Sequence, residues 1–294
     1  MPLLKDEAAK LSNNQLVSGV ITEIIDRDDL FAVLPFVGVN GKAYVYNREN
    51  QLATAAWLDP NDTVPEGAST FTEVTTNLRI LAGDVDVDKF LASTMSDTNN
   101  QLAIQIAAKA KGMGREFRKT LAQGDHETQQ KQFDGVQKLV DTKQVIDAGK
   151  KALTFSMLDE LLDKVPLGAD CIMMRPGTYR AYLSLLRATS GTNAPLVMME
   201  NFGRPMLTHN GVPIIVNEFL KLDEGDDACS IYAMRLNETD GLHGIYGGSN
   251  AGIVVEDIGT VQNKDATRTR LKWYCGLALK STKSLACLKG ITNM

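Results

Sequence analysis

The chain has 294 residues, of which 44% are hydrophobic and 23% are charged, and its formal net charge is −5 at pH 7. This composition predicts a globular protein of one large or two modest domains with enough apolar material for a core. The negative charge argues against a general nucleic-acid binder, and no apolar run approaches the ~20 residues that span a bilayer. The first residues, MPLLKDEAAKLSNN, lack the apolar core of a secretion signal, so we expect a soluble cytoplasmic protein.

The first 27 residues are expected to form a helical arm. Apolar residues recur there with the period of one helix face, and Asn13 or Asn14 could cap the helix. The stripe consists of Leu16, Val17, Val20, Ile21, Ile24 and Ile25. The pattern leaves open whether this helix packs on its own domain or binds a partner.

The stretch from Asp28 to Phe90 predicts a long two-stranded excursion. Its limbs, within 40–48 and around 71–74, are β-like, and the tip between them is rich in turn residues. A hairpin with so long a tip and so few large apolar residues is marginal by itself. We therefore expect it to rest on another surface, and a neighbouring copy of the chain is the economical candidate.

Three aspartates follow in the sequence Asp84-Val85-Asp86-Val87-Asp88. In a strand these carboxylates share one face, where they could bind Ca²⁺ or Mg²⁺, but no further ligand follows at the spacing of a calcium loop. We favour a strand with both valines inward and the acidic face in solvent. This strand would be the returning strand of the excursion.

Residues Asp97 to Gln123 predict one helix about 40 Å long. Asp97 or Thr98 would cap it. One face would carry Leu102, Ile106, Lys109 or Ala110, Met113 and Phe117. The glycines at 112 and 114 each cost a helix about 1 kcal/mol relative to alanine, which indicates close packing or a bend there.

The middle of the chain predicts an α/β region. After a compact turn at 133–136, Ser156 is expected to cap a helix with an apolar stripe, Cys171 to Met174 to form a buried strand, and Pro176 to begin another helix. The two stripes are Leu158, Leu161, Leu162 and Val165, then Tyr179, Tyr182, Leu183 and Leu186. Strands at 213–216 and 230–234 follow, separated by an acidic loop at 223–227.

The last part of the chain predicts strands at 253–255, 267–274 and 277–279. The glycine-rich segment 247–252 could cradle a phosphate, but it lacks a lysine and a helix start, so we interpret it as a flexible turn.

Nothing in the sequence predicts chemistry. There is no nucleophile elbow, zinc-protease motif, phosphate loop or dinucleotide fingerprint. The cysteines form no C-x-x-C pair, so we expect buried thiols, and no histidine has a second ligand within a helical turn. These residues are Cys171, Cys229, Cys275 and Cys287, and His126, His209 and His243. We therefore predict a non-enzymatic protein with no catalytic, cofactor-binding or metal-binding residues and no cofactor.

Short motifs in a definite order carry a resemblance to a known family. They are Leu34-Pro35-Phe36 before the hairpin, Asn210-Gly211-Val212-Pro213-Ile214-Ile215-Val216, and the closing segments Gly252 to Val255 and Arg270 to Leu279. Together with the order of elements, they resemble the major capsid protein of tailed bacteriophages. This is the Hong Kong phage fold, which encapsulin shells and herpesvirus capsid floors also use.

The resemblance implies an α+β phage major-capsid fold with an N-arm, an extended β-hairpin loop, a long spine helix, a peripheral domain and an axial domain. The implied ranges are 1–38 for the N-terminal arm, 39–90 for the extended loop, 91–150 for the spine helix and part of the peripheral domain, 151–250 for the axial domain and 251–294 for the C-terminal strands of the peripheral domain.

The implied function is structural. Copies of the chain would assemble as pentamers and hexamers into an icosahedral shell that encloses double-stranded DNA without sequence specificity. The virion capsid would be assembled in the host bacterial cytoplasm with scaffolding and portal proteins, with a decoration protein as a further partner and no membrane.

Two alternatives remain open: an encapsulin-type nanocompartment of the same fold, and a small-molecule enzyme that uses the α/β region at 151–235.

Some relatives cross-link their subunits through a lysine of the extended loop. Lys42, the one lysine between Asn40 and Leu81, lies near the base of the hairpin. We do not expect this chemistry here, because an isopeptide bond needs a desolvated amine beside a carboxylate.

Overall fold

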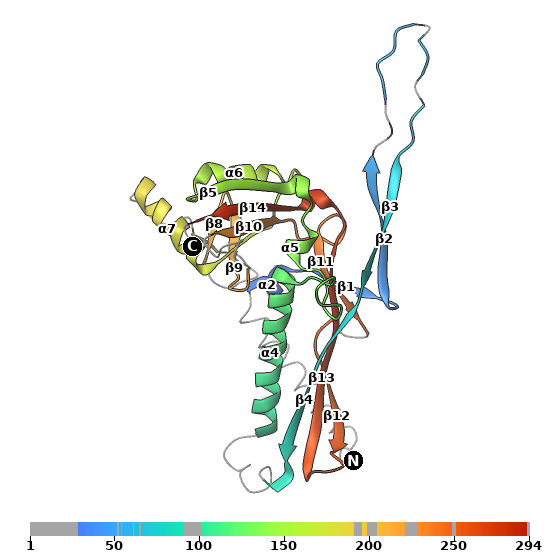
Figure 1. Cartoon of the computed structure of the whole chain (residues 1–294), viewed down its shortest axis with the longest axis vertical. Helices are drawn as coiled ribbons and strands as arrows, with labels where there is room; N and C mark the ends of the chain where they lie inside the picture. The colour runs from blue at the N-terminus through green and yellow to red at the C-terminus, as the bar shows by residue number, and fades with distance from the viewer. Residues whose placement is uncertain are drawn as a thin grey trace, which may run out of the picture.

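The computed structural model describes residues 29–90 except 52, 54, 61 and 65, then residues 101–190, 196–198, 205–220, 228–248 and 251–292. The expected arm helix in the first 27 residues, the helix cap at Asp97 or Thr98 and the acidic loop at 223–227 lie outside these ranges. Figure 1 shows three parts: an α/β body, a long helix beside a narrow sheet below it, and a two-stranded hairpin that projects beyond the body.

The α/β body contains a seven-stranded sheet with the order β5-β14-β10-β6-β9-β8-β7. The strands are β5 (Val145–Lys151), β6 (Cys171–Met174), β7 (Leu196–Met198), β8 (Pro205–His209), β9 (Val212–Val216), β10 (Cys229–Met234) and β14 (Leu285–Ile291). Helices α6 (Phe155–Asp163) and α7 (Pro176–Ser190) pack on it. The central strand β6 is buried on both faces, because Ile172 packs with these helices and Met173 packs with the core near the long helix. The predicted buried strand and the helix start at Pro176 are confirmed.

The predicted cap of helix α6 is wrong by two residues. Thr154, whose backbone is extended, is the N-cap, and its hydroxyl accepts a hydrogen bond from the Met157 amide at 3.4 Å. Ser156 already lies inside the helix. Either hydroxyl residue can cap a helix, so the pattern found the helix and misplaced its first turn.

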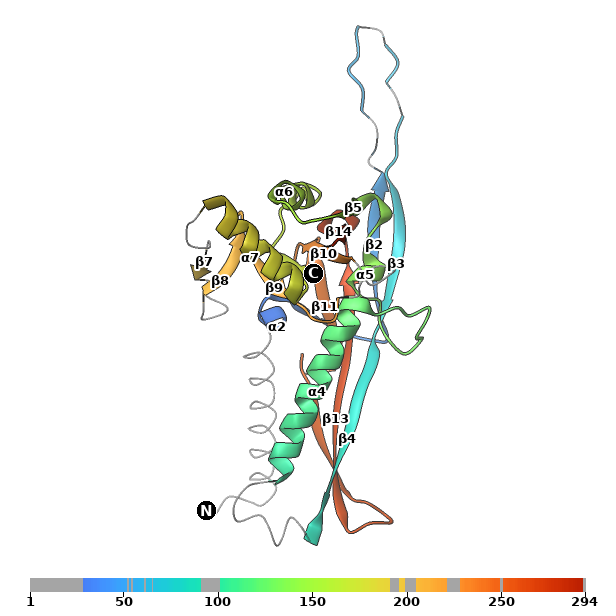
Figure 2. The same cartoon turned by 60° about the vertical axis from the view of Figure 1, so that its left-hand side comes forward.

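The narrow sheet has the order β1-β11-β13-β12, and β4 pairs with the other edge of β13. Its strands are β1 (Phe36–Val39), β4 (Arg79–Asp88), β11 (Leu242–Gly247), β12 (Val254–Thr260) and β13 (Ala266–Leu279). Residues 267–279, which we predicted to form two strands, form one continuous strand, because Cys275 and Gly276 pair with β11 without a break. Figure 2 shows helix α4 (Gln101–Gln123) lying along β4 and β13.

Strand β4 corrects the role assigned to Asp84–Asp88. The returning limb of the hairpin is β3 (Thr70–Asn77), whereas β4 pairs antiparallel with β13 over ten positions from Arg79 to Asp88. The predicted burial of the two valines is confirmed, since Val85 and Val87 face the core.

Helix α4 confirms the predicted long helix and its buried face. Ile106, Ala110 and Phe117 are almost fully buried, and Ala110, not Lys109, faces the core. The Phe117 ring lies 4.7 Å from the Trp273 ring of β13, within a cluster of aromatic side chains. A Cβ built at Gly112 would meet no atom within 4 Å, so close packing is not the reason for this glycine.

The predicted turn at 133–136 closes the C-terminal end of α4. A Cβ at Gly135 would lie 2.4 Å from the Thr120 carbonyl oxygen and 2.6 Å from that of Leu121. Only glycine fits this approach, and the Gly135 amide donates to the Gly124 carbonyl at 2.9 Å. The short elements are α2 (Asp29–Val33), α5 (Val136–Leu139) and two 3₁₀ turns at Thr142–Gln144 and Thr282–Ser284. Within the ranges that the structure describes, every helix is too short or too polar to span a bilayer.

Candidate assembly surface

The hairpin consists of β2 (Ala43–Gln51) and β3 (Thr70–Asn77), with residues 52–69 between them. The strands pair antiparallel from Ala43 opposite Asn77 to Gln51 opposite Thr70. The two predicted β-like limbs are confirmed, and Figure 1 shows that the outer part of the hairpin extends clear of the body. Lys42 comes directly before β2, at the base of the hairpin.

Contacts with the C-terminal end of β13 hold the base of the hairpin. The Tyr46 hydroxyl donates to the Leu279 carbonyl at 2.6 Å, and burial raises the pKa of this phenol. The Arg48 guanidinium donates to the carbonyls of Lys280 and Leu279, at 2.8 and 2.7 Å. Tyr44 and Tyr46 also pack over a small apolar cluster that includes Ile245. These contacts fix the direction in which the hairpin leaves the body.

Large apolar side chains are exposed along the hairpin. They are Val45, Trp57, Leu58, Val64 and Phe71, and Trp57 has a relative exposure of 103%. Several large apolar side chains exposed on one projecting hairpin are typical of an interaction site, because their exposure to water has a free-energy cost.

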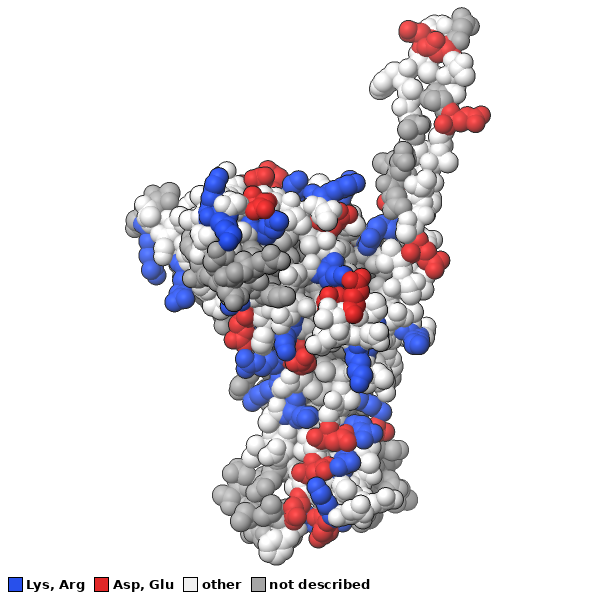
Figure 3. Space-filling model, viewed as in Figure 1, with Lys and Arg blue, Asp and Glu red and all other residues white. Residues whose placement is uncertain are grey.

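The same segment is purely acidic. No lysine or arginine occurs between Arg48 and Arg79, whereas five carboxylates do: Glu49, Asp59, Asp62, Glu66 and Glu73. Figure 3 shows acidic side chains on the projecting part of the hairpin and basic ones at its base. A complementary surface would therefore be apolar with basic groups around it.

The outward face of the narrow sheet carries a ladder of ion pairs. Arg270 binds both carboxylate oxygens of Asp84, at 2.7 and 2.9 Å, and Arg268 binds those of Asp86, at 2.6 and 2.7 Å. These hydrogen bonds hold the pKa values of Asp84 and Asp86 below the usual range. The acidic face is thus paired with arginines and not simply solvated, and Figure 3 shows basic and acidic side chains intermixed in this lower part of the molecule.

No metal site emerges from these carboxylates, because among the described residues no three His, Cys, Asp or Glu side chains gather closely enough to bind an ion.

One end of the same sheet face is apolar and exposed. Ile80 and Tyr274 lie opposite each other in the β4–β13 register and border a shallow hollow that also includes Arg270 and Lys272. Both basic groups are already paired, Arg270 with Asp84 and Lys272 with Glu256 at 2.6 Å, so this end offers mainly apolar surface.

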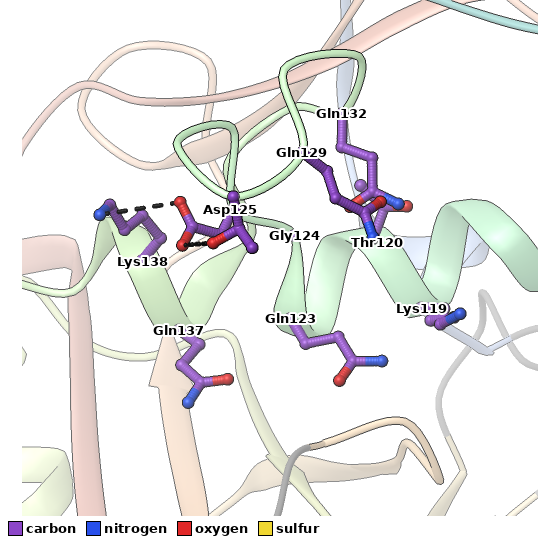
Figure 4. A pocket seen from close by; sticks show the side chains of 10 residues that line it. Lys119, Thr120, Gln123, Gly124, Asp125, Gln129, Gln132, Gln137 and Lys138 are labelled. Carbon is purple, nitrogen blue, oxygen red and sulfur yellow. Dashed lines mark hydrogen bonds and ion pairs between the residues drawn. The ribbon is translucent and has the colours of Figure 1, made fainter.

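A polar hollow lies beside the C-terminal end of α4 (Figure 4). Lys138 lies 3.7 Å from Asp125, whose pKa is lowered first by a 2.7 Å hydrogen bond from the Thr128 hydroxyl. The other lining side chains are mostly glutamines and threonines. Asp125 and Lys138 thus bind each other in this hollow, and Lys119 is its remaining charged group.

The four cysteines and His209 are buried in the core of the protein. All four cysteines are buried thiols outside disulfides, as predicted, and burial raises the pKa of Cys275 to about 12. His209 contacts Asp159 at 2.9 Å and the Tyr182 hydroxyl at 3.1 Å, a network that joins α6, α7 and β8. The sequence did not reveal this network, because its members are 23 to 50 residues apart.

A body with its own core, together with an apolar hairpin that is left exposed by the described part of the chain, is typical of a subunit that completes its contacts with other copies. The fold defines the class: this is the fold of capsid and encapsulin shell proteins. The family model for the major capsid protein GP7 matches residues 38–157. No curated protein is significantly similar in sequence to the chain.

Solved shell structures share the fold over most of the chain. The encapsulin of the holo-SrpI complex from Synechococcus elongatus PCC 7942 has a TM-score of 0.73 at 21% identity, covering 90% of this chain and 88% of that one. The capsid of the empty GTA particle gives a TM-score of 0.68 at 12% identity, with 89% of each chain covered. A chain of Microbacterium phage Oxtober96 gives 0.65 at 14% identity, covering 89% of this chain and 90% of that one.

The predicted resemblance is confirmed for the fold: the chain has the Hong Kong phage fold of the capsid and encapsulin structures, and its residues 38–157 match the model of the major capsid protein GP7.

Proposed function

We propose that the chain is the major capsid protein of a tailed phage, and that its copies assemble as pentamers and hexamers into an icosahedral shell around double-stranded DNA. The hairpin carries this proposal, because it is a long element whose apolar side chains are left exposed by the residues that the structure describes. In the shell it lies on a neighbouring copy. Scaffolding, portal and decoration proteins are further partners under this proposal.

The exposed apolar end of the narrow sheet is a candidate acceptor for the hairpin. Ile80 has a relative exposure of 72% and Tyr274 lies opposite it, whereas Arg270 and Lys272 in the same hollow are paired with Asp84 and Glu256. An apolar hairpin from the next copy would cover this end and gain apolar burial. Helix α4, on which Lys109 and Lys119 are exposed, is the second surface to test.

The division of the chain into an N-arm, an extended loop, a spine helix, a peripheral domain and an axial domain is part of the same proposal. Sheet membership supports changing two of the ranges. Strands β5 and β14 pair with each other and with the α/β sheet, whereas β11 pairs with β1 and β13 in the narrow sheet. The axial part would then take in β5 and β14, and the peripheral part would take in β11.

Replacing residues 52–69 by Asn-Gly tests the hairpin's role. Gln51 and Thr70 are paired, so a two-residue type I′ turn can join them and keep both strands and the base contacts. We expect a folded subunit, shown by unchanged circular dichroism, that forms no shells in electron micrographs. A Gly/Ser linker of equal length is the matched control for loop length and should fail as well. Normal shells from either variant would refute the role of the hairpin.

An encapsulin-type compartment is the second candidate function, and the TM-score of 0.73 with an encapsulin favours it. The two candidates differ in their contents. Shells isolated from the native host after nuclease treatment would contain protected DNA under the capsid proposal, whereas a protein cargo without DNA would support a compartment.

A further inference from the structure

His243 lies beneath the base of the hairpin, in strand β11. Its side chain is completely buried, its Nδ1 lies 3.4 Å from the Gly241 carbonyl, and its Nε2 has no hydrogen-bond partner. The ring of Tyr44, on the hairpin strand β2, meets it edge to face, with 5.6 Å between the ring centroids. A buried polar atom without a partner is costly, so this position needs a reason beyond packing.

The charged groups around His243 come from three elements. Lys280, just after β13, places its ammonium 5.8 Å from the Tyr44 ring centroid, on the side chain that also contacts His243. Arg48 and Tyr46 lie on the hairpin strand, where both bind backbone carbonyls. The loop before β11 contributes Glu238, and also Asp240, which is already paired with Arg235 at 3.0 Å.

We propose that His243 is a proton-sensitive latch for the hairpin: the neutral imidazole holds the base of the hairpin on the body, and the protonated ring releases it. A proton on the ring would place a second cation beside the Lys280 ammonium, with Glu238 as the nearby anion. The site can relieve that charge by letting Tyr44 lift and water enter. The inference concerns the single chain, and it holds whether or not the shell proposal does.

The direction of the pH effect follows from burial. Burial lowers the pKa of His243 below its ordinary value of 6.5, and Lys280 lowers it further. The closed base is therefore fully favoured above pH ~6.5 and is progressively lost as the pH falls through the lowered pKa. For each unit by which the pKa is lowered, protonation of the ring increases the equilibrium constant for opening about tenfold.

Hydrogen exchange of the hairpin amides, measured by mass spectrometry on the full-length unassembled chain, tests the latch. After correction for the intrinsic pH dependence of exchange, peptides from β2 and β3 should lose protection severalfold between pH 7.5 and 5.5. His243→Gln should abolish this difference. His126→Gln, a change at an exposed histidine, should leave it intact. A wild-type chain without the difference, or a His243→Gln chain that keeps it, would overturn the proposal.

Two surface variants keep the test decisive if His243→Gln does not fold. Lys280→Gln removes the nearby cation, so the transition should move to higher pH, whereas Glu238→Gln removes the nearby anion, so it should move to lower pH. Shifts in the same direction, or no shift in either variant, would show that a group other than His243 is responsible.

Discussion

Trp57 offers the sharpest test of the hairpin as an intersubunit contact. Its side chain is fully exposed, and the only other tryptophan, Trp273, is buried in the core. A tryptophan that becomes buried removes about 150–250 Å² from water, which at ~25 cal/mol per Å² amounts to about 4–6 kcal/mol. Truncating such an anchor costs about 2 kcal/mol or more in measured interfaces. We therefore expect Trp57→Ala to weaken each hairpin contact by at least ~2 kcal/mol.

Each copy contributes one hairpin, so the loss applies once per subunit and should raise the critical concentration for assembly about 30-fold. Light scattering over a concentration series measures this value, and Trp57→Phe, which keeps an aromatic anchor, should stay close to the wild type. The difference between wild-type and Trp57→Phe fluorescence isolates the Trp57 emission, which should shift to shorter wavelength on assembly. Assembly of Trp57→Ala at the wild-type concentration, or an unshifted emission in finished shells, would refute the reasoning.

Two matched pairs of substitutions test the packing of α4. Ile106→Ala empties a fully buried site and should lower the free energy of unfolding by about 2–5 kcal/mol in chemical denaturation, whereas Ile104→Ala, at an exposed site on the same helix, should change it by less than about 0.5 kcal/mol. Gly135→Ala would drive its methyl group into the Thr120 carbonyl and should lower the melting temperature sharply, whereas Gly112→Ala fills open space in a helix and should stabilise by up to ~1 kcal/mol. A reversed order within either pair would contradict the packing described.

Local patterns predicted the parts of the fold that depend on neighbouring residues. The buried face of α4 followed from apolar residues at helical spacing, and Ala110 took the place that the pattern left open between it and Lys109. The inward valines of β4 followed from strand alternation. In each case the signal lies within a few residues, so the sequence contains it directly.

Pairing between distant segments was the part that the sequence did not reveal. Strand β4 looked like a limb of the hairpin because it directly follows β3, yet its partner is β13, about 186 residues away in the register of Asp84 with Arg270. The ion-pair ladder was not predicted for the same reason, because the arginines that bind the aspartates lie near the other end of the chain. Trp57 was not singled out either, because an isolated aromatic residue in a polar tip has no period to detect.

The contacts that orient the hairpin impose an order on folding and assembly. Tyr46 and Arg48 bind the carbonyls of Leu279 and Lys280, which lie 231 to 233 residues further along the chain. A two-stranded hairpin is marginal by itself, so β2 and β3 cannot hold their observed direction until β13 has joined the narrow sheet. Under the proposed function, the surface that reaches the next subunit is thus completed by a strand near the end of the chain. A chain that has not finished folding would then lack an oriented hairpin, and only folded subunits would assemble.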